Sequence, residues 1–298
     1  MSRSEPRSEN LTGILLMLAA MALFAVEDLF LKLAAADLPI GQIILISGGL
    51  GLPVFVGMAW RQGKGILVKD ALQPAVIARN IGEMVAAAAY VAALAAVPLG
   101  TVASVLQALP LFMTMGAALV FGEVVGWRRW TAILVGFAGV LLVIQPGADG
   151  FRIEALLVLI SVAGIVVRDL AARAIPARVS TAQVSAWGLM SVTVLGLGMI
   201  AVSGEVRAVT GTEALVLMGA VVFGTAGYWA VTAATRTGEV SVVAPFRYAR
   251  LVFSMGIGVI FLAERPDLLT LVGAAIIVGS GLYAFARERA RKRASLTA

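Results

Sequence analysis

The sequence predicts an all-α membrane protein in which ten transmembrane helices form two inverted-topology repeats of five helices each. Three observations support this prediction: the composition is strongly apolar, ten segments are long enough to cross a bilayer, and the chain resembles itself at an offset of 141 residues. Together they indicate a duplicated membrane protein, an architecture common among secondary transporters.

The composition excludes most soluble classes of protein. Hydrophobic residues make up 60% of the 298 positions and charged residues only 13%, whereas soluble domains carry about 25% charged residues. The chain has no Cys and no His, so thiol nucleophiles, the usual zinc sites and the commonest general base are missing. We therefore expect no enzymatic activity, no cofactor and no metal site. The net charge of +6 does not indicate nucleic acid binding, because the basic residues lie in short loops and in the C-terminal tail.

Ten apolar segments meet the length of about 20 residues that a transmembrane helix needs. They lie at 12–35, 40–60, 72–95, 98–121, 128–145, 154–175, 181–202, 212–235, 239–262 and 268–286. The turn at 97–100 contains Pro98 and Gly100 and leaves almost no loop, so the third and fourth helices are expected to form a tight antiparallel hairpin. One face of the fourth helix carries residues at spacings of three and four, Thr101, Ser104, Gln107, Leu111 and Thr114, and all of them but Leu111 are polar, so they form a polar stripe.

The internal similarity appears at both ends of a unit of roughly a hundred residues. At the offset of 141, Leu15–Ala34 matches Leu156–Ile175 at seven positions, including Asp28 with Asp169. The same offset aligns the fourth and ninth helices, where Glu123 falls on Glu264. We therefore predict a first repeat at 11–145, a second at 154–286 and a basic cytoplasmic tail at 287–298.

The distribution of Lys and Arg predicts the orientation. With the N-terminus in the cytoplasm, the inner segments hold 15 Lys and Arg residues and the outer segments hold 3. Because positive charge concentrates on the cytoplasmic side, both ends of the chain are expected there. Each repeat has an odd number of helices, so the two halves cross the membrane in opposite directions.

Besides Lys32 and Arg173 near helix ends, eight charged residues fall in the interior of the predicted spans, where a charge is costly unless it faces protein or water. They are Glu27, Asp28, Arg79, Glu83, Arg168, Asp169, Arg247 and Arg250. A spacing of four predicts pairs within one helix, and the sequence has three of them: Arg79 with Glu83, Asp28 with Lys32, and Asp169 with Arg173. The arginines lie toward the inner half, where they either close the cytoplasmic end as a salt-bridge network or attract solutes that carry carboxylates. These two interpretations are compatible.

Uncharged side chains complete the set of candidate residues for substrate binding or gating. Gln107 belongs to the polar stripe, and the aromatic residues near mid-span are Tyr90, Trp187, Tyr228, Trp229 and Tyr248. Gly224 and Gly227 adjoin two of these aromatics and are candidates to bend a helix that lines a cavity.

Several of these segments resemble the EamA family of the drug/metabolite transporter superfamily. In the first half they are Ala96-Val-Pro-Leu-Gly-Thr-Val-Ala-Ser, Ala108-Leu-Pro-Leu-Phe, Phe121-Gly-Glu and Gly136-Phe-Ala-Gly-Val, and in the second half Ala244-Pro-Phe-Arg-Tyr, Ala263-Glu-Arg-Pro-Asp and Gly273-Ala-Ala-Ile-Ile. The resemblance implies a ten-helix carrier whose central cavity is lined mainly by helices three, four, eight and nine. The length of the chain and its ten-helix plan are similar to those of bacterial exporters of aromatic and other amino acids. Aromatic residues are sparse at the expected cavity positions, which argues against a narrow specificity for aromatic substrates.

Three functional hypotheses follow. The first is a secondary exporter of amino acids, with broad selectivity, in the bacterial inner membrane; Arg79, Arg247 or Arg250 would bind the carboxylate, and Glu83 or the Gln107 carbonyl the ammonium. The second keeps the carrier but changes the cargo to an apolar drug or a nucleobase-like metabolite. The third is a membrane enzyme or receptor, and the sequence shows no paired carboxylates near a nucleophile, no phosphate-binding loop and no appended soluble domain that would support it. The expected partners are a small-molecule substrate and membrane lipid, with the chain acting as a monomer. Proton antiport and facilitated diffusion both remain open.

Overall fold

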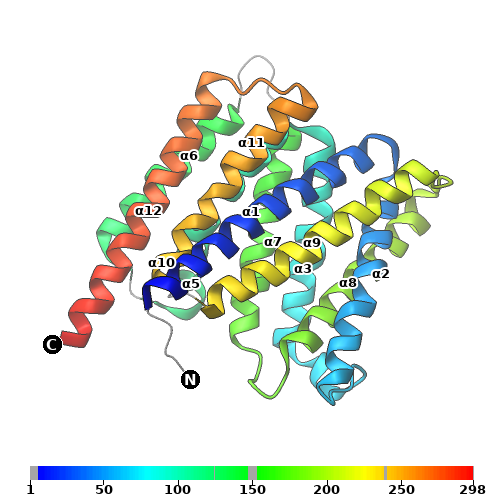
Figure 1. Ribbon diagram of the computed structural model, residues 1–298, viewed down its shortest axis with the longest axis horizontal. Helices are drawn as coiled ribbons and strands as arrows, with labels where there is room; N and C mark the ends of the chain where they lie inside the picture. The colour runs from blue at the N-terminus through cyan, green and yellow to red at the C-terminus, as the bar shows by residue number, and fades with distance from the viewer. Residues whose placement is uncertain (1–5, 124, 147–152, 238–239, 298) are drawn as a thin grey trace.

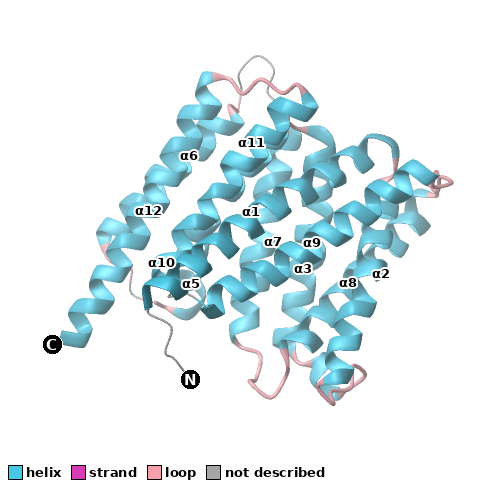
Figure 2. Cartoon of the chain, in the orientation of Figure 1, coloured by secondary structure: helices cyan, strands magenta, loops and turns pink. Residues whose placement is uncertain are grey.

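The computed structural model describes residues 6–123, 125–146, 153–237 and 240–297, and within these ranges it contains helices and no strand (Figures 1 and 2). The elements are α1 (Pro6–Asp37), α2 (Ile40–Arg61), η1 (Lys69–Leu72), α3 (Pro74–Ala96), α4 (Leu99–Leu106), α5 (Leu109–Phe121), α6 (Trp127–Ile144), η2 (Ile153–Ala155), α7 (Leu156–Arg173), α8 (Thr181–Ser203), α9 (Gly211–Thr237), α10 (Val240–Val243), η3 (Ala244–Tyr248), α11 (Ala249–Leu262) and α12 (Leu268–Thr297).

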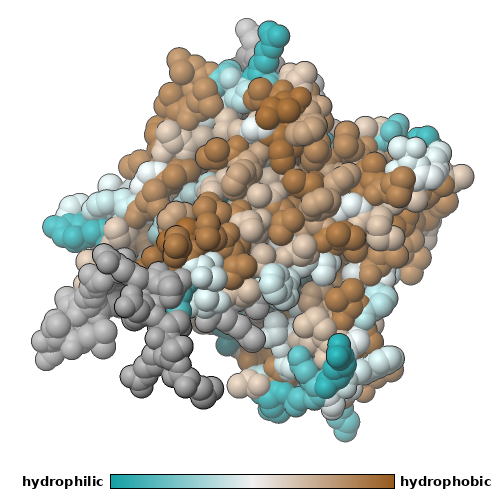
Figure 3. Space-filling model, in the orientation of Figure 1, coloured by the Kyte–Doolittle hydropathy of each residue, from teal (hydrophilic) through white to brown (hydrophobic). Residues whose placement is uncertain are grey.

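The ten predicted spans are confirmed, since ten helical segments of the described chain are long and apolar enough to cross a membrane. In Figure 3 apolar residues cover most of the visible face, and hydrophilic residues gather toward its margins. The chain is therefore a multi-pass membrane protein. The tail predicted from residue 287 differs in one respect: α12 continues as a helix through it to Thr297.

The packing of the helices follows the repeat. The closest packing joins the two halves, α1 against α9 and α3 against α7. The offset of 141 relates α1 to α7 and α3 to α9, so these two contacts are copies of one another. The same holds for α2 with α8 and for α6 with α12, where each helix packs against its own repeat equivalent. Contacts of this kind are expected from two halves related by a pseudo-twofold axis.

One pair of glycines allows α3 and α7 to cross at backbone distance. A Cβ atom added to Gly82 would lie 2.7 Å from both the Gly164 carbonyl oxygen and the Arg168 amide nitrogen. A Cβ on Gly164 would in turn lie 2.7 Å from the Ala86 amide nitrogen. Small residues at such crossings are the usual means of close packing between membrane helices, and here they bring the charged residues of α3 and α7 together.

The cytoplasmic location of both ends is a prediction that cysteine labelling can test, because the chain has no cysteine of its own. We expect a Glu205→Cys variant, in the exposed loop after α8, to react with a membrane-impermeant thiol reagent applied to intact cells. A Gln62→Cys variant, at the exposed end of α2, is expected to react only after the cells are opened. The opposite labelling pattern would reverse the orientation.

Candidate substrate site between the two repeats

Both copies of the fourth helix are broken at the same repeat position. In the first half α4 ends at Leu106 and α5 begins at Leu109, and in the second half α10 and η3 precede α11, which begins at Ala249. The sequence predicts one continuous helix in each half, so the breaks are a finding of the structure. Proline lacks the N–H group and its ring clashes with the carbonyl four residues earlier. Pro110, at the second position of α5, accounts for the first break, and Pro245, at the second position of η3, accounts for the end of α10.

Gln107 connects the two breaks. Its side chain is buried, and its Nε2 donates hydrogen bonds to the carbonyl oxygens of Tyr248, at 2.9 Å, and Arg247, at 3.4 Å. Backbone carbonyls freed inside a membrane helix need such partners. The Tyr248 side chain lies against α12, where a Cβ on Gly281 would overlap its hydroxyl group. The amide nitrogen of Gln107 thus stabilises the break, and the binding role predicted for its carbonyl stays a prediction.

An ion pair between the repeats lies at the centre of the bundle. Asp28 of α1 is 1% exposed, and Arg250 Nη2 of α11 donates to both of its carboxylate oxygens at 2.8 Å. The Tyr90 hydroxyl of α3 donates to Asp28 Oδ1 at 2.5 Å and accepts from Arg250 Nη2 at 3.1 Å. The guanidinium also lies 5.3 Å from the centre of the Phe24 ring. This arrangement, which we call the central triad of Asp28, Tyr90 and Arg250, joins α1, α3 and α11.

A second group of charges joins α3 to α7. Arg79 Nη2 lies 3.0 Å from Glu83 Oε2, which confirms the pair that the spacing predicts. Glu83 Oε1 lies 3.2 Å from Arg168 Nη1, and Arg168 Nε lies 2.7 Å from Asp169 Oδ1. The structure thus brings four of the predicted site residues into one network, which holds two cations and two anions and is therefore electrically balanced.

Arg247 differs from the other arginines within the spans. It belongs to η3 at the helix break and is exposed, although Arg168, Asp169 and Arg250 all lie within electrostatic reach of it. Its guanidinium makes no hydrogen bond or salt bridge to any residue that the structure describes. An exposed cation among interior charges is available to bind an anionic group.

The pairing predicted for Asp28 with Lys32 is corrected by the structure. Asp28 binds Arg250 instead, and Lys32 Nζ donates to two carbonyls at the C-terminal end of α3, those of Leu94 at 2.8 Å and of Val97, the residue after the helix, at 2.6 Å. Lys32 also lies 3.8 Å from Glu264 Oε1. Arg250 donates to both carboxylate oxygens of Asp28, and such multiple charged hydrogen bonds are the strong ones.

Glu264 also holds the start of α4. Its Oε1 accepts a hydrogen bond from the Leu99 amide at 2.7 Å and its Oε2 one from the Gly100 amide at 3.2 Å. These are amide groups that a helix leaves without partners at its N-terminus. Lys32, Glu264 and the 97–100 turn therefore tie α1, the α3–α4 hairpin and the end of α11 together. We call this group the outer latch, after the side of the membrane on which the distribution of Lys and Arg predicts it to lie.

The repeat equivalents of Lys32 and Glu264 are Arg173 and Glu123, and they too form a pair. Arg173 Nη1 lies 3.2 Å from Glu123 Oε1, so Arg173 does not take the predicted partner Asp169, which binds Arg168 instead. The side chains of Arg173 and Glu123 are 51% and 50% exposed, against 18% and 11% for Lys32 and Glu264. The latch at one end of the bundle is thus buried while its counterpart at the other end is open to solvent.

The remaining predicted aromatics occupy different environments. Trp187 is fully buried and its indole N–H donates to the Ile66 carbonyl at 2.8 Å, so it anchors the loop after α2 to α8. Tyr228 is 39% exposed and makes an edge-to-face contact with Phe55, with ring centres 5.6 Å apart. Trp229 is 67% exposed. α9 is continuous through Gly224 and Gly227, and α1 side chains pack directly against both glycines.

The loops at the predicted cytoplasmic side are joined by one exposed ion pair. Arg178 Nη2 lies 2.7 Å from Asp70 Oδ1, and this hydrogen bond lowers the pKa of the Asp70 carboxyl below its ordinary value. Pairs as exposed as this one contribute little to stability, so we assign it only the ordering of the loop.

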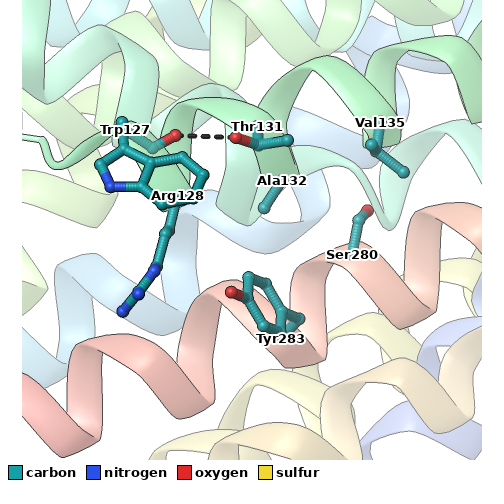
Figure 4. Close-up of a pocket in the computed structure, with 7 residues that line it drawn as sticks. All are labelled: Trp127, Arg128, Thr131, Ala132, Val135, Ser280 and Tyr283. Atoms are coloured by element: carbon teal, nitrogen blue, oxygen red, sulfur yellow. Dashed lines mark hydrogen bonds between the residues drawn. The ribbon is translucent and has the colours of Figure 1, made fainter.

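A groove of about 340 Å³ lies elsewhere, between α6 and α12 (Figure 4). Its lining comes from the first two turns of α6 and from Ser280 and Tyr283 of α12, and the Trp127 ring at its edge is 72% exposed. None of the charged residues of α1, α3, α7 or η3 contributes to it. The groove is therefore separate from the candidate site.

Sequence reasoning missed the roles of Glu264 and Glu123. Each of them follows the fourth helix of its repeat, and the offset of 141 aligns the two in the sequence. An acid preserved at the same place in both copies was the available signal, but its partners are contributed by other helices and only the fold brings them close.

Comparison with known proteins gives a consistent result. Residues 11–145 and 152–285 both match the EamA-like transporter family. A protein named riboflavin transporter from Rhizobium johnstonii is 29% identical over 219 residues, which cover 72% of this chain and 72% of that protein. The pseudopaline exporter CntI of Pseudomonas aeruginosa strain UCBPP-PA14 is 26% identical over 90% of this chain and 93% of the exporter. A protein named S-adenosylmethionine uptake transporter from Rickettsia bellii is 23% identical over 64% of this chain and 65% of its own length.

A solved crystal structure also matches. It superposes with a TM-score of 0.61 at 22% identity, covering 94% of this chain and 98% of the other. At this level of identity the likeness shows the fold alone.

Proposed function

Because this chain belongs to the EamA-like transporter family, we propose that it is a secondary transporter that exports amino acids, with broad selectivity, across the bacterial inner membrane. Its relatives are transporters of small molecules rather than enzymes. The observation that carries the choice of amino acids is Arg247, an exposed guanidinium at the break of a transmembrane helix. A guanidinium binds a carboxylate through two parallel hydrogen bonds, which gives both affinity and orientation.

Three features of the site support a zwitterionic cargo. The central triad and the network of Arg79, Glu83, Arg168 and Asp169 neutralise their own charges. Arg247 is left to attract an anion, and it belongs to η3, the segment between α10 and α11; many transporters build their substrate sites from such discontinuous helices. The few exposed aromatics near the site favour recognition by charge rather than by stacking.

Alternating access is the mechanism that we propose for this site. In inverted repeats the two halves exchange conformations around a fixed central site. The outer latch and the pair Glu123–Arg173 are repeat equivalents in different environments, as expected of a carrier whose outer end is closed. Export begins from this state, with substrate entering from the cytoplasm.

A second candidate cargo is a larger metabolite of another class. The similarity to the protein named riboflavin transporter favours a cargo of this kind. That similarity extends over 219 residues, between the 192 and 268 residues aligned with the two other relatives. The names of the relatives include both an exporter and uptake transporters, so export is likewise our proposal.

An Arg247→Gln variant is expected to bind amino acids more weakly while remaining folded. Loss of a charged hydrogen bond worth about 1.5–3 kcal/mol corresponds to about a 10- to 100-fold increase in the apparent KM. The measurement is counterflow of labelled leucine into proteoliposomes that contain the purified protein. Arg265→Gln, which removes an exposed arginine from the loop before α12, is the matched control. An unchanged KM in Arg247→Gln would remove this residue from the site.

A further inference from the structure

Comparison of the two repeats shows that α9 has a glycine at the position where α3 has an acidic ion-pair partner. The offset of 141 relates Glu27 of α1 to Arg168 of α7, and it relates Glu83 of α3 to Gly224 of α9. In the crossing of α3 with α7, Glu83 and Arg168 form an ion pair at 3.2 Å. In the equivalent crossing of α9 with α1, a charged residue on α1 faces a glycine.

The contact between Glu27 and Gly224 is direct. A Cβ atom added to Gly224 would collide with the Glu27 carboxylate. The carboxylate therefore lies against the backbone of α9, at the place where the other half of the protein has the partner's side chain. Glu27 therefore lacks the ion-pair partner on the facing helix that its repeat equivalent Arg168 has in Glu83.

The groups that face Glu27 are already engaged. Asp28 beside it on α1 binds Arg250 of α11, and the Tyr90 hydroxyl of α3 donates to Asp28. Arg250 attracts Glu27 electrostatically, but its Nε and Nη2 hydrogens are used on Asp28 and Tyr90. Lys32, farther along α1, is engaged in the outer latch by the carbonyls of Leu94 and Val97 and by Glu264.

Within the part of the chain that the structure describes, Glu27 makes no hydrogen bond and no salt bridge. Its side chain is only partly exposed, in the middle of a transmembrane helix. A carboxylate held in this position is costly unless a cation or a proton joins it. A structural role in stabilising the empty protein is therefore a poor explanation for its presence.

We propose that Glu27 binds the ammonium group of the transported solute. The assignment rests on the proposed function and deepens it: Arg247 of η3 binds the carboxylate, Glu27 of α1 binds the ammonium, and α1 packs directly against η3. Gly224 leaves the space beside the α9 backbone that the Glu27 carboxylate occupies. A carboxylate and a guanidinium on two adjoining elements discriminate for solutes that carry both charges.

The test compares leucine with 4-methylpentanoate, the same molecule without its amino group, as competitors of labelled leucine counterflow. The wild-type protein is expected to bind leucine at least about tenfold more tightly, the equivalent of 1.4 kcal/mol. In Glu27→Gln that ratio is expected to fall toward one through weaker binding of leucine, with binding of 4-methylpentanoate unchanged. Glu205→Gln, a loss of charge in an exposed loop, is expected to keep the wild-type ratio.

Two further readouts separate binding from folding. Because Glu27 lacks a partner in the described structure, Glu27→Gln is expected to unfold at a temperature no lower than the wild-type protein. Gly224→Ala, which pushes the Glu27 carboxylate aside, is expected to weaken leucine binding and to leave 4-methylpentanoate unaffected. A drop in the unfolding temperature of Glu27→Gln with the binding ratio preserved would overturn the proposal in favour of a structural role.

The remaining outcomes are also decisive. If Glu27→Gln keeps the wild-type ratio but efflux no longer responds to an imposed pH gradient, Glu27 carries a proton and the ammonium assignment is wrong. If the ratio and the response are both unchanged, only this inference fails. If the wild-type protein shows no counterflow of leucine or any other amino acid, the proposed function fails, and the assignment of an ammonium fails with it.

Discussion

Asp28→Asn is expected to destabilise the protein by about 3–5 kcal/mol, the usual cost of removing one partner from a buried ion pair. The substitution leaves Arg250 in the centre of the bundle with a neutral amide where it now has two carboxylate hydrogen bonds at 2.8 Å. The measurement is the thermal unfolding midpoint of the purified protein in detergent.

Two further variants make this result specific. Asp169→Asn removes the repeat-equivalent carboxylate, whose side chain is 38% exposed, and is expected to lower stability by only about 1 kcal/mol or less. The double variant Asp28→Asn with Arg250→Met removes both charges and is expected to recover much of the loss, because the unpaired charge disappears. A wild-type unfolding midpoint in Asp28→Asn would contradict the role of the central triad.

Glu264→Gln is expected to open the outer end of the bundle. The change removes the charge that accepts from the Leu99 and Gly100 amides and that attracts Lys32. Hydrogen bonds to charged groups contribute about 1.5–3 kcal/mol, enough to shift a two-state population by about tenfold or more. A cysteine at Thr101, in the first turn of α4, is expected to react several times faster with a membrane-impermeant reagent applied from outside.

The repeat supplies the matched control for this experiment. Glu123→Gln removes the equivalent acid, but its pair with Arg173 is half exposed and contributes little to closing its end. It is expected to leave the outer reactivity of the cysteine at Thr101 unchanged. If the two substitutions changed the outer reactivity equally, the outer latch and the pair Glu123–Arg173 would be in the same state, which contradicts this account.

Sequence reasoning reached the architecture because the forces that determine it are local. Each span is apolar enough to be recognised by itself, and the offset of 141 relates the halves without any knowledge of contacts. The breaks at Gln107 and before Ala249 were not predicted, although Pro110 and Pro245 stood in the sequence. Proline is tolerated in membrane helices when neighbouring groups stabilise the break, and the hydrogen bond that the Gln107 amide donates to the Tyr248 carbonyl at the second break joins residues 141 positions apart.

The candidate site was predicted less completely, because its pairs depend on partners far apart in the chain. The pair Arg79–Glu83 lies within one helix and was found by spacing. Asp28 and Arg250 are separated by 222 positions, so spacing favoured Lys32 as the partner of Asp28. From the sequence Glu27 was recognised only as a charge inside a span. Its lack of an ion-pair partner became visible only in the fold, where it faces Gly224 of α9.

The measurement that tests the account most directly is efflux from proteoliposomes loaded with equal concentrations of labelled leucine and riboflavin. The account predicts that leucine leaves through the wild-type protein, that riboflavin is retained, and that Arg247→Gln slows the release of leucine while Arg265→Gln does not. Release of riboflavin with retention of leucine would contradict the proposal of amino-acid export and favour the other class of cargo.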